Sequence, residues 1–157
     1  MNEESPIPGG TVPQVGSVIA NKYTLLEDLG TADSGHIFLA EQTTLRKKVI
    51  ATIFDPEFAS KRGFGARILR EARVLSLVRH ANVARLLSYG KTEMGGVYLI
   101  GENLQGDDLR HLRSAAQRFP WSRVKAIALQ IIGGLRAAQG KGLVHGDIRP
   151  SNVFLVN

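Results

Sequence analysis

The sequence contains no cysteine, which excludes disulfide bonds and metal sites built on thiolates. It has no uninterrupted apolar stretch near the ~18 residues that suggest a membrane span. The first residues are acidic and then rich in proline and glycine, so they lack the basic start and apolar block of a secretory signal. We therefore expect a cytoplasmic protein without a membrane segment, whose residues 1–16 form a flexible leader.

Aromatic residues are scarce, at 6%, and no run of five or more like charges occurs. The net charge of +6 comes from 20 Lys and Arg residues against 14 Asp and Glu residues, dispersed along the chain. Dispersed charges are more typical of solvated helix faces than of a nucleic-acid-binding surface, so we expect no nucleic-acid partner. The hydrophobic content of 43% indicates a folded chain, and 157 residues suffice for one ordinary domain.

Apolar and β-branched runs predict several strands before the first long helix and after it. The predicted strands cover residues 18–29, 37–39, 49–54, 83–87 and 97–100. Between residues 64 and 79 the period becomes helical, which predicts an amphipathic helix. Its apolar residues are Ile68, Ala72, Leu75 and Val78.

Two more helices are predicted in the last third of the chain. Asp107 is placed to cap a short helix through residue 116, and Pro120 fits the start of a longer helix that Gly140 and Gly142 end. The longer helix is apolar on several sides and therefore needs cover on several sides. Further parts of the same domain or a dimer interface can supply that cover. Alternatively, the helix tolerates solvent exposure because many of its residues are alanine.

The strongest chemical signal lies in residues 145–152, which read His-Gly-Asp-Ile-Arg-Pro-Ser-Asn. This segment resembles the catalytic loop of protein kinases, H-R-D-L-K-P-x-N, at the His, Asp, Pro and Asn positions. Nearly the whole chain is similar, in order and spacing, to the N-terminal part of a bacterial Hanks-type Ser/Thr protein kinase domain. The other matching segments are the glycine-rich loop at residues 29–37, helix C at 70–72, the turn at 80–83 and the fifth strand with the hinge at 98–104.

The resemblance implies an α+β fold. A kinase-like N-lobe, made of a five-stranded antiparallel sheet and helix C, is expected over residues 17–101. A hinge and the first helices of an incomplete C-lobe, which ends in the catalytic loop, are expected over residues 102–157.

The resemblance also implies a role for individual residues. Asp147 would orient the substrate hydroxyl and accept its proton, Arg149 would place positive charge near the transferred phosphoryl group, and Asn152 would bind Mg²⁺. The implied cofactors are ATP and Mg²⁺, and the implied partner is a protein substrate or a regulatory protein. The implied nucleotide-binding positions are Gly30, Ala32, Gly35, Ile37, Thr52, Glu71, Glu102 and Leu104.

Several positions depart from the family pattern. Thr52 stands where the family has the Lys that holds the α- and β-phosphates, and Lys48, on the same face of the predicted strand, is ~13 Å away. Ala32 replaces the middle glycine of the loop, Gly146 replaces the Arg of H-R-D, and Gly101 leaves the gatekeeper position without a side chain. No segment of the sequence reads D-F-G, the motif whose Asp holds the essential metal.

These departures leave three hypotheses for function. The first is a truncated, pseudokinase-like module of the Ser/Thr kinase family that binds ATP, recruits or regulates a partner and transfers no phosphate by itself. The second is an active Ser/Thr protein kinase, acting from ATP onto protein Ser or Thr, of which this chain is a fragment. The third is a non-enzymatic module that binds acidic partners through a basic helix surface over residues 67–79.

Overall fold

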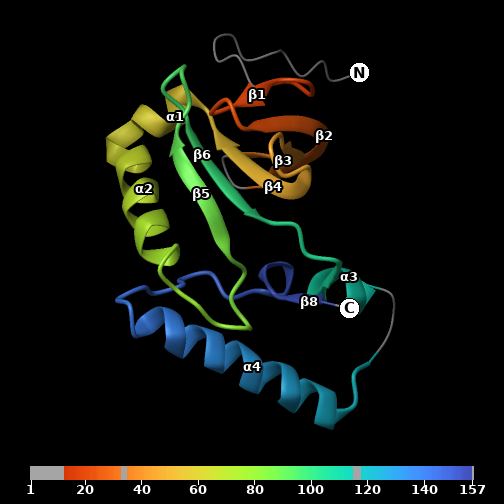
Figure 1. Cartoon of the computed structure of the whole chain (residues 1–157). Coiled ribbons are helices and arrows are strands. Elements are labelled where there is room, and N and C mark those ends of the chain that lie inside the picture. The colour runs from red at the N-terminus through yellow and green to blue at the C-terminus, as the bar shows by residue number, and fades with distance from the viewer. Residues whose placement is uncertain (1–12, 33–34, 115–117, 157) are drawn as a thin grey trace, which may run out of the picture.

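The computed structural model describes residues 13–32, 35–114 and 118–156 of the chain. A curled antiparallel sheet occupies one end of the molecule with helix α2 (Phe64–Leu75) along its side, and helix α4 (Trp121–Gln139) crosses the other end (Figure 1). The predicted α+β class is confirmed. Of the predicted leader, residues 1–12 lie outside the described residues, and Gly16 donates a backbone hydrogen bond to the Leu25 carbonyl at 2.8 Å.

The large sheet has six strands in the order β1-β2-β3-β4-β6-β5, one more than the resemblance predicts. The additional strand is β1, because Ala20 and Asn21, with φ of 52° and 53°, turn the chain inside the predicted strand 18–29. That stretch therefore folds as a hairpin. The strands are β1 (Val18–Ile19), β2 (Tyr23–Ala32), β3 (Gly35–Gln42), β4 (Lys47–Phe54), β5 (Leu86–Lys91) and β6 (Val97–Glu102).

Smaller elements fill the connections between the sheet and the long helices. They are α1 (Pro56–Ser60), the 3-10 helices η1 (Lys61–Gly63) and η2 (Pro150–Asn152), α3 (Leu109–Ser114), and the paired strands β7 (Gly106–Asp108) and β8 (Phe154–Val156). The pairing of β7 with β8 brings the end of the chain back beside the segment that leaves β6. The hinge region and the catalytic-loop region are therefore neighbours.

Helix α2 ends at Leu75, four residues before the predicted boundary at residue 79. The Ser76 hydroxyl donates a hydrogen bond to the Arg73 carbonyl at 2.7 Å, which satisfies a carbonyl of the last turn. The next backbone bond runs from Leu77 N to Val74 O, a three-residue step that closes the helix.

The cap of α3 is Asp108 rather than the predicted Asp107. The Asp108 Oδ1 accepts a hydrogen bond from the His111 backbone N–H at 2.8 Å. Asp107 instead lies in β7, opposite Leu155 of β8. The predicted strand 83–87 also shifts to Leu86–Lys91, because the residues before it form a turn in which Val83 N donates to His80 O.

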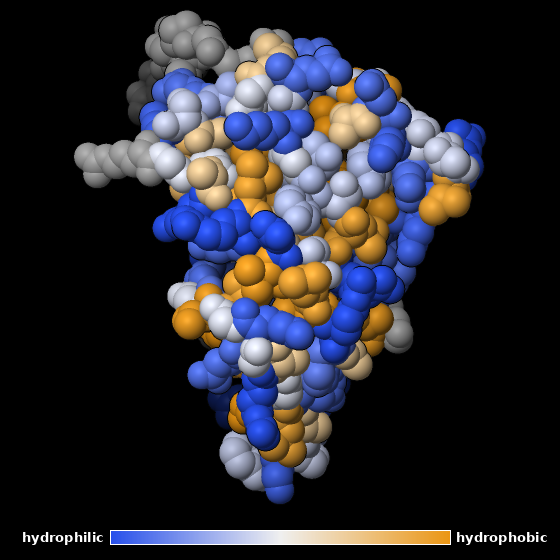
Figure 2. Space-filling model, turned by 60° about the vertical axis from the view of Figure 1, so that its left-hand side comes forward, coloured by the Kyte–Doolittle hydropathy of each residue, from blue (hydrophilic) through white to orange (hydrophobic). Residues whose placement is uncertain are grey.

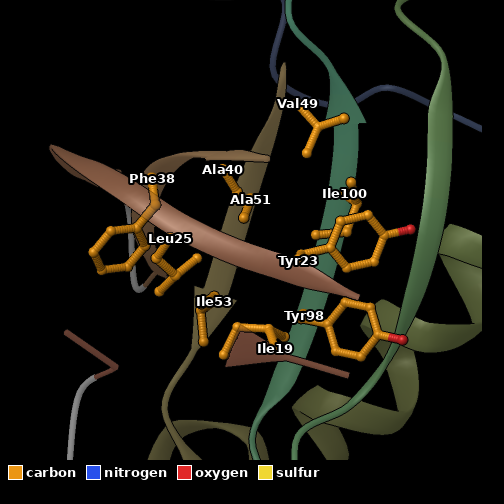
Figure 3. Packing of buried hydrophobic residues seen from close by; sticks show 10 residues of the cluster. All are labelled: Ile19, Tyr23, Leu25, Phe38, Ala40, Val49, Ala51, Ile53, Tyr98 and Ile100. Carbon is orange, nitrogen blue, oxygen red and sulfur yellow. The ribbon is translucent and has the colours of Figure 1, made fainter. Parts of the chain in front are cut away.

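The main core lies on one face of the curled sheet (Figure 3). Strand β4 contributes Val49, Ala51 and Ile53, whose alternation with half-buried neighbours is that of a strand with one fully buried face. The complete cluster is Ile19, Tyr23, Leu25, Phe38, Ala40, Val49, Ala51, Ile53, Tyr98 and Ile100. Thr52, which alternates with these residues, lies on the opposite face.

Helix α4 packs against the turn that follows α2. Asn82 Nδ2 donates a hydrogen bond to Gln130 Oε1 at 2.9 Å. At Gly134 an added Cβ would lie 2.7 Å from the Asn82 carbonyl oxygen and 3.2 Å from Val83 Cγ2, so only glycine permits this approach. This contact joins the two ends of the molecule.

The other side of α4 is only partly covered, although the sequence shows apolar character there. Trp121 is 77% exposed and Leu129 is 59% exposed, and Val124 and Ile132 are exposed as well. Figure 2 shows apolar surface among hydrophilic residues in the lower part of the molecule, at the height of α4 in Figure 1. Within the described ranges, no helix is both long enough and apolar enough to cross a membrane.

The α4 contact predicts an unusual response to alanine. In an ordinary helix, Gly→Ala stabilises by about 1 kcal/mol. We expect Gly134→Ala to lower the unfolding free energy by about 1–3 kcal/mol, because its Cβ would overlap the Asn82 backbone. Urea denaturation measures the change. The control is Gly140→Ala, whose Cβ would meet its nearest neighbour at 3.4 Å. A Gly134→Ala protein as stable as the wild type would contradict the packing.

Candidate functional site

The predicted catalytic-loop residues come together between α4 and β8. Asn152 Nδ2 donates hydrogen bonds to the Asp147 backbone oxygen at 2.9 Å and to its carboxylate Oδ2 at 2.8 Å. Arg149 Nε lies 3.1 Å from the same Oδ2. Helix η2 fixes the spacing, since Asn152 N donates to Arg149 O at 2.9 Å. The loop is thus held in shape by its own polar side chains.

The residues before Asp147 have structural roles in the loop. His145 Nδ1 accepts a hydrogen bond from the Asp147 backbone N–H at 3.3 Å. Gly146 has a φ of +73°, a conformation that glycine adopts without strain. The glycine that replaces the Arg of H-R-D therefore suits the backbone of this turn.

The Asp147–Arg149 ion pair lies at the surface, with the side chains 53% and 48% exposed. Solvent screens such a pair strongly, so its contribution to stability is small. Its consequence is local: the guanidinium offsets the negative charge of Asp147 and helps to fix the direction of the carboxylate.

The second group of predicted residues lies on the face of the sheet opposite the core. Thr52 of β4 pairs with Ile37 of β3 and with Leu99 of β6, and directly paired residues point to the same side. An added Cβ at Gly35 would lie 3.0 Å from Thr52 Cγ2 and 3.1 Å from Phe54 Cε1. The end of the glycine-rich hairpin therefore rests on a methyl group and a phenyl ring.

The start of the glycine-rich hairpin is engaged by an acidic side chain. Gly30 has a φ of +100°, and its backbone N–H donates a hydrogen bond to Asp28 Oδ1 at 2.7 Å. In the family, backbone N–H groups of this loop approach the phosphates. Here the Gly30 N–H is bonded to a carboxylate of the same chain. Ala32 lies in β2 opposite Gly35, and residues 33–34 lie outside the described residues.

Glu71 pairs with a neighbour on its own helix. Its Oε1 lies 3.8 Å from Arg67 Nε, one helical turn away, and both side chains are about 60% exposed. The helix C position of the family thus carries an exposed ion pair here.

At the hinge, Glu102 of β6 is hydrogen-bonded to Arg85, the residue before β5. Its Oε1 accepts a hydrogen bond from the Arg85 backbone N–H at 2.8 Å, and its own N–H donates to the Arg85 carbonyl at 3.1 Å. Leu104 follows in the half-buried connection to β7. At Gly101 an added Cβ would meet its nearest neighbour, the Arg85 carbonyl oxygen, at 3.8 Å, so there is room on that face.

The described residues do not fit a magnesium triphosphate. Thr52 supplies no charge, and Lys48 lies toward the opposite end of β4 from Phe54, which pairs with Gly35. Among the residues that the structure describes, no group of three or more His, Cys, Asp or Glu side chains is arranged to hold a metal ion. Asp147 and Asn152 offer one carboxylate and one amide, which already bond to each other.

A curled antiparallel sheet with one helix, followed by a His-Gly-Asp loop after a long helix, defines a kinase-like N-lobe and the beginning of a C-lobe. The sequence profile of the protein kinase domain matches residues 23–157. The chain therefore belongs to the protein kinase domain family. The predicted resemblance to the N-terminal part of a bacterial Ser/Thr kinase domain is confirmed.

Bacterial kinases are among the similar proteins. Serine/threonine-protein kinase pkn3 of Myxococcus xanthus is 31% identical over 141 residues, which cover 90% of this chain and 26% of that protein. PknA of Mycobacterium tuberculosis is 27% identical over 147 residues, covering 91% and 34%. The crystal structure of the C20A mutant of the PknI kinase domain of Mycobacterium tuberculosis shares the fold, with a TM-score of 0.81 and 24% identity, covering 93% of this chain and 59% of that one. The chain thus spans about a third or less of these two curated relatives.

Several contacts at the site are not among the sequence predictions. The Asp28–Gly30 bond has a local signal, an Asp two residues before a glycine, which is a common turn pattern. The Arg85–Glu102 bonds and the position of Phe54 beneath Gly35 have no such signal, because their partners are distant in the sequence.

The loop geometry predicts a specific effect of losing the Asn152 amide. We expect Asn152→Ala to remove about 0.5–1.5 kcal/mol of local stability, because it loses two hydrogen bonds that are exposed to solvent. Faster hydrogen exchange of the β7 and β8 amides, with β4 unchanged, is the readout. Ser151→Ala, which keeps both Asp147 contacts, is the matched control. Unchanged exchange in Asn152→Ala would show that the loop does not depend on this side chain.

Proposed function

We propose that this chain is a pseudokinase-like module of the Ser/Thr kinase family, which acts by engaging a regulatory protein partner and does not transfer phosphate itself. Residues 17–101 serve as its N-lobe and residues 102–157 as its hinge and partial C-lobe. The cytoplasm is its proposed place of action. The observation that carries the proposal is Thr52 at the lysine position, packed with Phe54 beneath Gly35.

Phosphoryl transfer requires little covalent chemistry from the protein. Catalysis rests on positioning the reactants and on neutralising the charge of the phosphates. The Thr52 side chain and the Phe54 ring under the glycine-rich hairpin provide no positive charge, and the Thr52 hydroxyl is only a neutral donor. Asp147 retains the place of the family's catalytic base, but a base alone does not hold the terminal phosphate in position.

A radioactive phosphotransfer assay tests this proposal directly. We expect the 157-residue chain, incubated with labelled ATP, Mg²⁺ and a general Ser/Thr protein substrate, to incorporate no label above background. A kinase domain with the strand Lys, assayed in parallel, establishes sensitivity. Mg²⁺-dependent incorporation that Asp147→Asn abolishes would overturn the proposal.

A second candidate function is an active Ser/Thr kinase of which this chain is a part. The geometry that favours it is the Asp147–Asn152 pair, which is in place and hydrogen-bonded. This candidate predicts that the coding DNA continues beyond residue 157 into D-F-G and A-P-E. It also predicts that Thr52→Lys raises the activity of the longer protein, with Thr52→Val as the uncharged control. A longer protein that Thr52→Lys leaves inactive would count against it.

The third candidate, a basic binding surface on α2, receives less support from the structure. Arg67 is paired with Glu71 and its guanidinium lies 5.4 Å from the centre of the Phe64 ring. Its charge is thus partly offset within the helix, although Arg70 and Arg73 are exposed. Binding to polyanions that weakens with salt and ignores ATP would favour this candidate.

A further inference from the structure

We propose that the tip of the β3–β4 hairpin is a docking surface for an anionic phospholipid membrane. The tip consists of residues 43–48, which read Thr-Thr-Leu-Arg-Lys-Lys, and all six are exposed. An exposed leucine thus directly precedes three consecutive basic residues at one end of the large sheet. The proposal goes beyond the proposed function and does not depend on it, because the tip shares no residue with the nucleotide-site or catalytic-loop positions.

Internal contacts fix the shape of this tip. Arg46 has a φ of 53°, and its backbone N–H donates a hydrogen bond to the Gln42 carbonyl at 2.8 Å, which closes the turn. Its Nη1 lies 3.0 Å from Glu41 Oε1. Leu45 lies inside the closed turn in sequence, yet its side chain is 67% exposed. A surface whose shape is already set loses little conformational entropy when it docks.

A fourth basic residue lies beside the tip. Thr43 donates two hydrogen bonds to the Lys22 carbonyl, from its backbone N–H at 2.9 Å and from its hydroxyl at 3.3 Å. The exposed Lys22 therefore belongs to the same end of the sheet. The basic residues gathered there are Lys22, Arg46, Lys47 and Lys48. Glu41, which pairs with Arg46 and stands opposite Lys48, offsets one of these four charges, so the surface remains positive.

The combination of basic and apolar groups favours a lipid surface as the partner. Each Lys or Arg near an anionic membrane contributes about 1 kcal/mol, or roughly a five-fold gain in affinity. Lys and Arg keep their charged ends among the headgroups while their aliphatic stems lie along apolar surface. An adjacent leucine gains further by entering the boundary between headgroups and acyl chains. An acidic protein segment would need a pocket shaped to Leu45, whereas a membrane accepts this side chain without one.

Co-sedimentation of the chain with vesicles tests the proposal. We expect vesicles of equal parts phosphatidylglycerol and phosphatidylcholine to bind it at least about ten-fold more tightly than phosphatidylcholine alone. The double variant Lys47→Gln/Lys48→Gln should lose at least about ten-fold of that affinity. The matched control is Arg70→Gln/Arg73→Gln, which removes the same charge from exposed positions of α2 and should lose less than about two-fold.

Leu45→Ser separates the apolar contribution from the charge. We expect it to weaken binding to the mixed vesicles about three-fold. This loss should persist when the salt concentration is raised, because burial of an apolar side chain is not screened, whereas the loss caused by the lysine variant should shrink. Circular dichroism of each variant shows that the fold is kept.

Four results would contradict the proposal. They are a wild-type chain that does not prefer the anionic vesicles, an equal loss in the α2 control, which indicates diffuse attraction, and an unchanged affinity in Leu45→Ser. The fourth is a poly-glutamate peptide that binds through Lys47 and Lys48 more tightly than the vesicles do, since it would assign the tip to an acidic protein segment. Phosphotransfer by the chain would overturn the proposed function and leave this proposal standing.

Discussion

The antiparallel register of β3 against β4 is the constraint on which the rest of the site depends. It sets Gly35 opposite Phe54 and Ile37 opposite Thr52, and paired residues in a sheet share a face. The hairpin therefore closes onto whatever β4 presents at those positions. In this chain β4 presents Thr52 and a phenyl ring, so these positions supply no positive charge where a kinase needs it.

The polar groups that the family uses for nucleotide chemistry have partners inside this protein. Asp28 accepts the hairpin N–H of Gly30, and Arg67 pairs with Glu71. In the loop, Asp147 receives the amide of Asn152 and lies beside the guanidinium of Arg149. Each of these groups therefore has a partner within the chain itself.

Local sequence patterns predicted the longer strands and helices and the catalytic-loop half of the site. The alternation in β4 and the helical spacing in α2 are short-range signals, and both elements form where they were expected, although α2 is four residues shorter. The residues of the loop from Asp147 to Asn152 lie within six positions of one another, so the sequence spacing alone brings them together. The turn at Ala20 and Asn21 was not predicted, because both residues have positive φ and neither is a glycine, the usual signal for that conformation.

By itself the sequence determined the family, the order of the longer strands and helices, and the loss of the strand lysine at Thr52, since each of these is written in residue identity and spacing. Only the tertiary structure decided which side chains pack beneath Gly35, how Glu102 bonds to Arg85, and how closely Gly134 approaches Asn82. The physical reason is distance along the chain. Periodicity specifies which face of an element is apolar, whereas contacts between elements depend on register and packing, which form only when the whole chain has folded.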